Sequence, residues 1–255
     1  MLALSSLSAE AQRLIARGLV RDAAGRLARD ERDFTRHFAA AAAAPLIEIA
    51  PAAPGDAGAA LGFALAWAQS GPPGGFLAWA APDAHVGEHG GPCAEGLARF
   101  GLSLDRLLFI AARTQTDALW ASEQALAAPG ASALCTVAPG SKSLSLTATR
   151  RLLLAAEKHG ARCALLRLDR LAASAAWMRW RIAAAASEAA GRELGRPAFT
   201  AHLERSRAGP SGLSWRLDWN ANAHAFRAAE CAVDGAVAAA PGDRPDRPGA
   251  RIRAA

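Results

Sequence analysis

The chain contains no tyrosine, and only two of its 29 basic residues are lysines, so arginine carries nearly all of the positive charge. Its four cysteines (Cys93, Cys135, Cys163 and Cys231) are widely separated and form no CxxC pair, which favours a reducing compartment. No apolar run approaches the roughly 20 residues that cross a bilayer. The first residues lack the basic and apolar regions of a secretory signal. We therefore expect a cytoplasmic protein without a membrane span.

The overall composition is that of a globular domain. A hydrophobic fraction of 52% over 255 residues is enough to build a sizeable core. The formal net charge of +6 favours acidic partners, either nucleic acid or an acidic protein surface. Charge alone fits a merely basic soluble protein equally well.

Short apolar runs alternate with helical segments through the first two thirds of the chain. The expected strands are 46–50, 75–80, 107–111, 133–138 and 163–168, and the expected helices lie near 57–69, 93–100, 116–127 and 147–159. Nearly continuous apolar strands separated by helices are typical of a parallel sheet covered on both faces. The pattern therefore predicts an α/β fold.

The pattern changes after residue 168. Residues 177–182, 199–207 and 213–220 alternate apolar and polar side chains, and the stretch "AGPSG" between the last two is a typical hairpin loop. A period of two indicates strands with one buried face. We expect these segments to extend the sheet in antiparallel fashion.

The two ends of the chain differ from the part between them. Ser8 is expected to cap a helix closed by Gly18, and a second helix is expected over 23–44, ended by Pro45. The last residues are rich in proline and arginine without apolar periodicity, which predicts disorder. We divide the chain into an N-terminal helical segment (1–44), a core (45–235) and a tail (236–255).

The segment 46–68, "LIEIAPAAPGDAGAALGFALAWA", has the layout of a phosphate-binding loop: strand, glycine-rich turn, helix. Such a loop needs a lysine for the β- and γ-phosphates and a hydroxyl for Mg²⁺. Neither is present near Ala57 and Gly58, and Asp56 places negative charge where a phosphate would lie. The loop is predicted to be a relic.

In the stretch "HVGEH", His85, Glu88 and His89 match the spacing of the zinc-binding motif of inverted zinc proteases. That motif requires a helix, and the glycines at 87 and 90 argue against one. We therefore expect a solvated loop and no metal.

The stretch 138–147 resembles a displaced phosphate loop only in its pair Lys142–Ser143, because the required glycines are missing. It lacks the context of a hydrolase nucleophile as well. The simpler interpretation is a connection ended by Thr147 as helix N-cap, with Ser145 as the alternative cap.

A basic region covers residues 147–216, which hold 13 Lys or Arg against 5 Asp or Glu. The candidates there for binding nucleic acid or a protein partner are Arg150, Arg151, Trp177, Arg179 and Arg181. On a strand, Arg179 and Arg181 would share a face beside Trp177. The alternative is a solvated arginine face with the tryptophans pointing into the core.

Several stretches resemble known families. Segment 46–68 resembles the first strand, loop and helix of the RecA recombinase core. More specifically, "DALWASEQAL" (117–126), "LSLTATRRLLLAAEKHGARCALLRL" (144–168), "SAAWMRWRIAAAAS" (174–187) and "WRLDWN" (215–220) resemble ImuA, the RecA-like protein of bacterial mutagenesis cassettes.

The resemblance implies a RecA-like fold and a part in error-prone translesion DNA synthesis induced by DNA damage. It implies an ImuB-like homologue of Y-family polymerases as partner, with RecA, DNA and a second copy of the chain as further candidates. The strand ends "FLAWAAPDA" and "LCTVAPG" lack the acids of a RecA-type ATPase, so no catalytic, cofactor or metal residue is expected. A non-catalytic adaptor is favoured, with a DNA-dependent ATPase and a SulA-like division inhibitor as alternatives.

Overall fold

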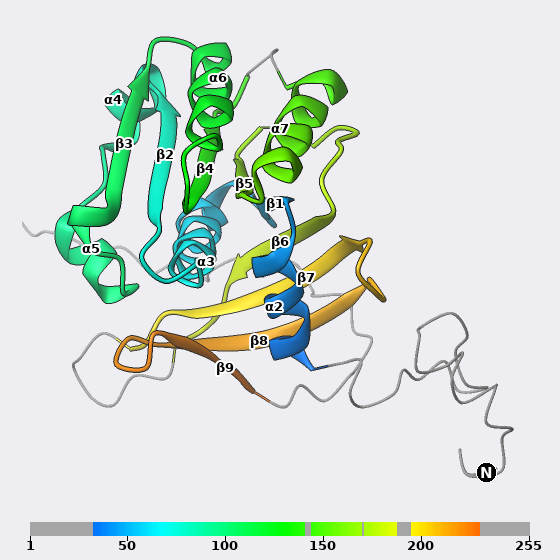
Figure 1. Ribbon diagram of the computed structural model, residues 1–255. Coiled ribbons are helices and arrows are strands. Elements are labelled where there is room, and N and C mark those ends of the chain that lie inside the picture. The colour runs from blue at the N-terminus through cyan, green and yellow to red at the C-terminus, as the bar shows by residue number, and fades with distance from the viewer. Residues whose placement is uncertain (1–32, 141–143, 170, 188–194, 230–255) are drawn as a thin grey trace, which may run out of the picture.

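A computed structural model describes residues 33–229, apart from 141–143, 170 and 188–194. Within these residues one nine-stranded sheet has the order β3-β2-β4-β5-β1-β6-β7-β8-β9 (Figure 1). The strands are β1 (Leu46–Pro51), β2 (Phe76–Pro82), β3 (Leu107–Ala112), β4 (Ala131–Val137), β5 (Arg162–Arg167), β6 (Met178–Ala184), β7 (Ala198–Ser206), β8 (Leu213–Asn220) and β9 (Ala225–Ala229). The α-helices are α2 (Phe34–Ala43), α3 (Ala57–Gln69), α4 (Asp83–His89), α5 (Ala94–Arg99), α6 (Gln115–Ala125) and α7 (Leu146–His159).

The sheet changes from parallel to antiparallel at β6. The pairs from β3 through β1 to β6 are all parallel, and the pairs β6–β7, β7–β8 and β8–β9 are antiparallel. This confirms the predicted mostly parallel sheet with flanking helices and an antiparallel C-terminal extension. The last strand, β9, had not been expected as a separate element.

Helices cover the parallel half on both faces. Along β1, Ile47 and Ile49 pack in the core on the side of α3, whereas Leu46 packs in the core beneath α6 and α7. Helix α3 is apolar on nearly its whole circumference and contributes eight buried residues. An all-round apolar helix needs cover on every side, and α3 lies against the sheet with α2 beside it (Figure 1).

An aromatic cluster covers one face of the antiparallel half. Trp180 and Trp215 are buried in it and contact Phe34 of α2, whose ring also meets Phe226 of β9. Helix α2 begins after Asp33, whose carboxylate accepts a hydrogen bond from the N–H of Thr35. The described part of the predicted helix 23–44 is therefore helical and belongs to this core.

Arg162 joins the ends of two helices to the sheet. Its buried guanidinium donates to the carbonyl oxygens of Trp67 and Ala68 at 2.9 and 2.8 Å, and it lies 4.2 Å above the Trp67 ring. It also donates to Ser132 Oγ and to the carbonyl oxygen of Ala42. These acceptors are neutral, and burial lowers the pKa of Arg162 to about 10. The negative ends of the α2 and α3 dipoles supply the stabilisation that a carboxylate would give.

Two local predictions were wrong. Residues 83–89, expected as a loop, form helix α4, because a single interior glycine weakens a helix without breaking it. The chain leaves α4 at Gly90, where φ is +83°. The N-cap of α7 is Ser145 and not Thr147, since Ser145 Oγ accepts a hydrogen bond from the N–H of Ala148 at 3.2 Å.

Other predictions fall on parts of the chain outside the described residues. These are the helix expected after Ser8, the pair Lys142–Ser143 and the tail 236–255.

Candidate functional site

The connection from β1 to α3 has the shape expected of a phosphate-binding loop. The chain leaves β1 at Pro51, forms the 3-10 turn η3 (Pro54–Asp56) and enters α3 at Ala57. Ala57 and Gly58 occupy the positions where such a loop carries its lysine and hydroxyl. The shape is present, and the groups that hold phosphates and Mg²⁺ are not.

Asp56 places a carboxylate inside this loop. Its Oδ2 accepts a hydrogen bond from the N–H of Ala53 at 3.0 Å, and its Oδ1 accepts one from the N–H of Ala184, at the end of β6, at 2.9 Å. Backbone N–H groups are the ligands by which glycine-rich loops hold anions. Because the Asp56 carboxylate already bonds an N–H of the loop and is itself negative, a phosphate entering here would meet repulsion and a lost hydrogen bond.

Neither β2 nor β4 ends in an acid. Strand β2 ends in Ala80, Ala81 and Pro82, and the next acid, Asp83, lies exposed in the first turn of α4. At the end of β4, Thr136 is fully buried and its hydroxyl accepts a hydrogen bond from Trp79 Nε1 at 3.0 Å. The ends of β2 and β4 therefore hold neutral contacts, whereas β5, which lies beside β1, is followed by Asp169, and this acid pairs with Arg167.

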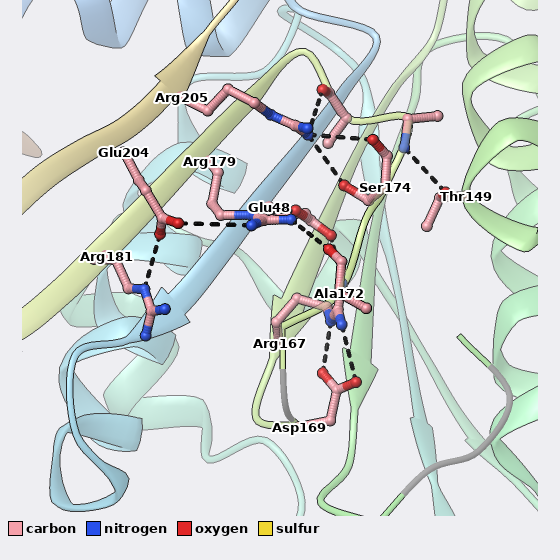
Figure 2. Close-up of polar contacts among 12 residues, drawn as sticks. Glu48, Thr149, Arg167, Asp169, Ala172, Ser174, Arg179, Arg181, Glu204 and Arg205 are labelled. Carbon is pink, nitrogen blue, oxygen red and sulfur yellow. Dashed lines mark hydrogen bonds and ion pairs between the residues drawn. The ribbon is translucent and has the colours of Figure 1, made fainter. Parts of the chain in front are cut away.

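Arg179 and Arg181 share one face of β6, as predicted, and both are engaged by carboxylates (Figure 2). Arg179 Nε lies 2.7 Å from Glu48 Oε2, and Arg179 Nη1 lies 3.6 Å from Glu204 Oε1. Arg181 Nε lies 2.9 Å from Glu204 Oε2. Much of the positive charge on this face is thus neutralised within the molecule.

Glu48 lies at the centre of this cluster and is completely buried. Its second carboxylate oxygen binds Arg167, which is 1% exposed and also pairs with Asp169 at 2.6 Å. The sequence analysis did not single out either residue, although a glutamate inside the apolar run "LIEIA" is a signal for a buried ion pair. Glu48 thereby links β1 to β5 and β6 through charge.

Glu204 lies toward the solvent side of the same cluster. Partial burial opposes ionisation of its carboxyl, but the hydrogen bond and charge of Arg181, together with those of Arg179, outweigh that effect. The pKa of Glu204 is held below its ordinary value as a result. The carboxylate therefore remains ionised and paired at neutral pH.

The five predicted binding residues come from helix α7 and from the start of strand β6. Trp177 is partly buried and packs against both hydrophobic cores, on the same face as Arg179. Arg150 and Arg151 lie exposed on α7, and Arg151 pairs with Glu123 of α6 at 2.7 Å. Of the four arginines, two thus lie on a helix and two on a strand.

An apolar groove of about 550 Å³ begins at the first turn of α3, next to the phosphate-type loop. It runs between α3 and the pair α4–α5 and reaches the start of β7. Its aromatic lining consists of Trp79, Phe100, Phe109 and Phe199. Such a lining suits apolar side chains and not the phosphates of a nucleotide. No local sequence pattern marks this groove, because its walls come from seven separate elements: α3, β2, α4, α5, β3, β6 and β7.

Two histidines of α4 lie on one wall of this groove. The rings of His85 and His89 stack with centroids 4.4 Å apart. Burial, followed by the charge of His89, lowers the pKa of His85 against the opposite effect of Glu88. Within the described residues, no group of three or more His, Cys, Asp or Glu side chains is arranged to hold a metal ion.

Comparison with known proteins gave no match to any family model and none to any curated protein. Among solved structures, the RadB recombinase is similar over 70% of this chain and 89% of its own, with 15% identity and a TM-score of 0.49. SulA from Pseudomonas aeruginosa is similar over 48% of this chain and 97% of its own, with 24% identity and a TM-score of 0.38. These similarities concern the backbone fold alone, and no activity of either protein is assigned to this chain on their basis.

Across the described ranges, no helix combines the length and apolar character needed to cross a membrane.

Proposed function

We propose that this protein is a non-catalytic, RecA-like adaptor of the cytoplasmic complex that carries out translesion DNA synthesis after DNA damage. The observation that carries the proposal is the phosphate-type loop occupied by Asp56, whose carboxylate bonds the N–H groups of Ala53 and Ala184. A RecA-like framework retained without its nucleotide chemistry suits a protein that acts through its surfaces.

The proposed partner is an ImuB-like homologue of Y-family polymerases, on the strength of the sequence stretches that resemble ImuA. RecA is a second candidate partner. We place protein ahead of DNA because Arg179 and Arg181 already pair with Glu48 and Glu204, which reduces the charge available for phosphates.

Nucleotide binding is the first test. Titration with a fluorescent ATP analogue should show no saturable binding below about 1 mM, a limit that corresponds to about 4 kcal/mol. The matched variant combines Asp56→Gly, Ala57→Lys and Gly58→Thr, which removes the carboxylate and restores the lysine and hydroxyl. Gain of binding in that variant would show that the loop geometry is intact and only its chemistry is missing. Saturable binding by the unaltered protein would support the ATPase alternative instead.

Partner capture is the second test. The purified protein should retain an ImuB-like protein in a pull-down and should not retain FtsZ. Retention of FtsZ alone would contradict the adaptor proposal and support a division inhibitor.

A further inference from the structure

We propose that the apolar groove between α3 and α4–α5 binds a short segment of the partner protein in which apolar or aromatic side chains are flanked by basic residues. The inference rests on the proposed function, in which this chain acts by binding proteins, and it names the surface and the chemistry of that contact. The groove volume of about 550 Å³ falls within the range of about 300–1,000 Å³ that is usual for ligand pockets, which leaves room for more than one apolar side chain.

The aromatic lining of the groove is fixed before any partner arrives. The rings of Phe100 and Phe199 lie over Gly62 of α3, 3.1 and 3.2 Å from the position of a Cβ on that glycine. The same two rings pack on other aromatic side chains. Phe100 stacks on Trp219 with ring centroids 5.1 Å apart, and Phe199 meets Phe226 at 5.7 Å. An occupant therefore meets rings that are already ordered, which lowers the entropic cost of binding.

Part of the lining is bare backbone. Gly90 and Gly91, which follow α4, line the groove together with Gly96 of α5. Gly58, in the first turn of α3, lines it as well. A Cβ on Gly58 or Gly90 would meet no atom within 4 Å. Peptide groups without side chains allow close approach of an incoming chain, while the rings pack against its apolar side chains.

The lining carries no fixed charge. None of the described residues that line the groove is Asp, Glu, Lys or Arg. Burial lowers the pKa of His85, so its imidazole is uncharged at neutral pH. A metabolite with a phosphate or carboxylate would find no partner here for that charge. Apolar side chains of a protein segment need none, which favours a protein as the occupant.

The border of the groove is acidic, although the chain as a whole has a net charge of +6. Within two positions of a lining residue, the described chain holds four acids and two bases: Asp56, Asp83, Glu88, Glu95, Arg99 and Arg196. Glu95 and Arg99 pair with each other at 3.1 Å. The remaining acids outnumber the remaining base. Such a border attracts basic residues on either side of the apolar anchors.

Filling the groove is the first test. Gly58→Leu and Gly96→Leu each add an apolar side chain to the lining, and a Cβ at either position meets nothing closer than 3.9 Å. Leucine is also a better helix former than glycine, so both variants should fold. In the full-length chain, each should raise the Kd for a purified ImuB-like protein at least about tenfold, as loss of a buried anchor does.

Gly87→Leu is the matched control. Gly87 lies exposed on α4 outside the lining, and a Cβ on it would also meet no atom within 4 Å. Its Kd should equal that of the unaltered protein. Equal Kd values for all three variants would overturn the groove as the docking site and leave the proposed function standing. Failure of the unaltered protein to bind the ImuB-like protein would overturn both.

Cys93 locates the occupant without any substitution, because it lines the groove and is exposed. A saturating amount of the ImuB-like protein should slow alkylation of Cys93 by N-ethylmaleimide at least about tenfold, since a covered thiol is inaccessible. Mass spectrometry follows the modification at this cysteine. An unchanged rate in the saturated complex would place the contact elsewhere and overturn the proposal.

Glu88→Arg tests the charge of the flanking residues. Glu88 lies exposed on α4, so reversing its charge should weaken the complex with little effect on the fold. The loss of affinity should be larger at about 0.05 M salt than at about 0.5 M, where charges are screened. An unchanged or tighter complex would show that the segment is not basic and would overturn that part of the proposal.

Discussion

The five parallel strands β3-β2-β4-β5-β1 are covered by helices on both faces, whereas helices of the described chain cover only one face of β7 and β8. The burial of charged side chains differs between the two halves in the same way. In the parallel half, Glu48 and Arg167 are almost fully buried and bonded to one another. On the open face, Arg181 and Glu204 pair while roughly a third exposed. An arginine–glutamate ion pair is therefore buried in the core of the parallel half and exposed to solvent in the antiparallel half.

The largest expected effect follows from removing the buried acid. Glu48→Ala would leave Arg167 and Arg179 without the carboxylate that lies between them. Loss of one partner of a buried pair typically costs about 3–5 kcal/mol. The loss is measured as the difference in the free energy of unfolding, obtained from urea denaturation, between the variant and the unaltered protein. A loss below about 1 kcal/mol would mean that the buried cluster behaves like a surface one.

A smaller loss is expected at Arg162, where the buried charge has neutral acceptors. Arg162→Met would strip hydrogen bonds from the carbonyl oxygens of Trp67 and Ala68 and from Ser132. The two carbonyl oxygens keep hydrogen bonds from Ser70 and Gly71, so the loss is that of the Arg162 bonds themselves, about 2–3 kcal/mol in total. Arg162→Lys keeps the charge but not the planar fork, and it should recover only part of the loss. Full recovery by lysine would show that charge at the helix ends matters more than the individual hydrogen bonds.

The smallest effect is expected on the open face. Glu204→Gln should lower the free energy of unfolding by less than about 1 kcal/mol at pH 7, because solvent screens the pair with Arg181. The pKa of Glu204 is below its ordinary value of 4.5, so this contribution is present above that pH and is lost as the pH falls through the lower, folded-state value. Unfolding curves between pH 6 and pH 3 should show less acid destabilisation in the variant. An unchanged pH profile would mean that the ion pair contributes nothing to stability.

The two halves also differ in how well they could be predicted. The apolar runs at 46–50 and 163–168 define buried parallel strands whatever lies next to them, because only a doubly covered sheet accommodates such runs. Strand β9 has no comparable signal. Its Phe226 contributes by meeting Trp219 on the neighbouring strand β8 and Phe63 of α3, which is distant in sequence.

The start of helix α7 and the existence of helix α4 could not be decided from the residue pattern alone. Both Ser145 and Thr147 are good N-caps, and in the structure Ser145 Oγ accepts the N–H of Ala148 while Thr147 lies in the first turn of α7. At α4, the contacts of this helix with β2 and β3 outweigh the cost of an interior glycine.

By itself, the sequence determined the class of fold and showed that the loop before α3 lacks the lysine and hydroxyl of a phosphate-binding loop, because hydrophobic periodicity and the side chains of a short loop are local properties. Only the tertiary structure decided what the remaining groups do. It turned Asp56 toward Ala53 and Ala184, buried Glu48 between two arginines and enclosed an apolar groove with seven elements. Hydrogen bonds, ion pairs and cavities join residues more than a hundred positions apart, and their energies exist only once the chain has brought those residues together.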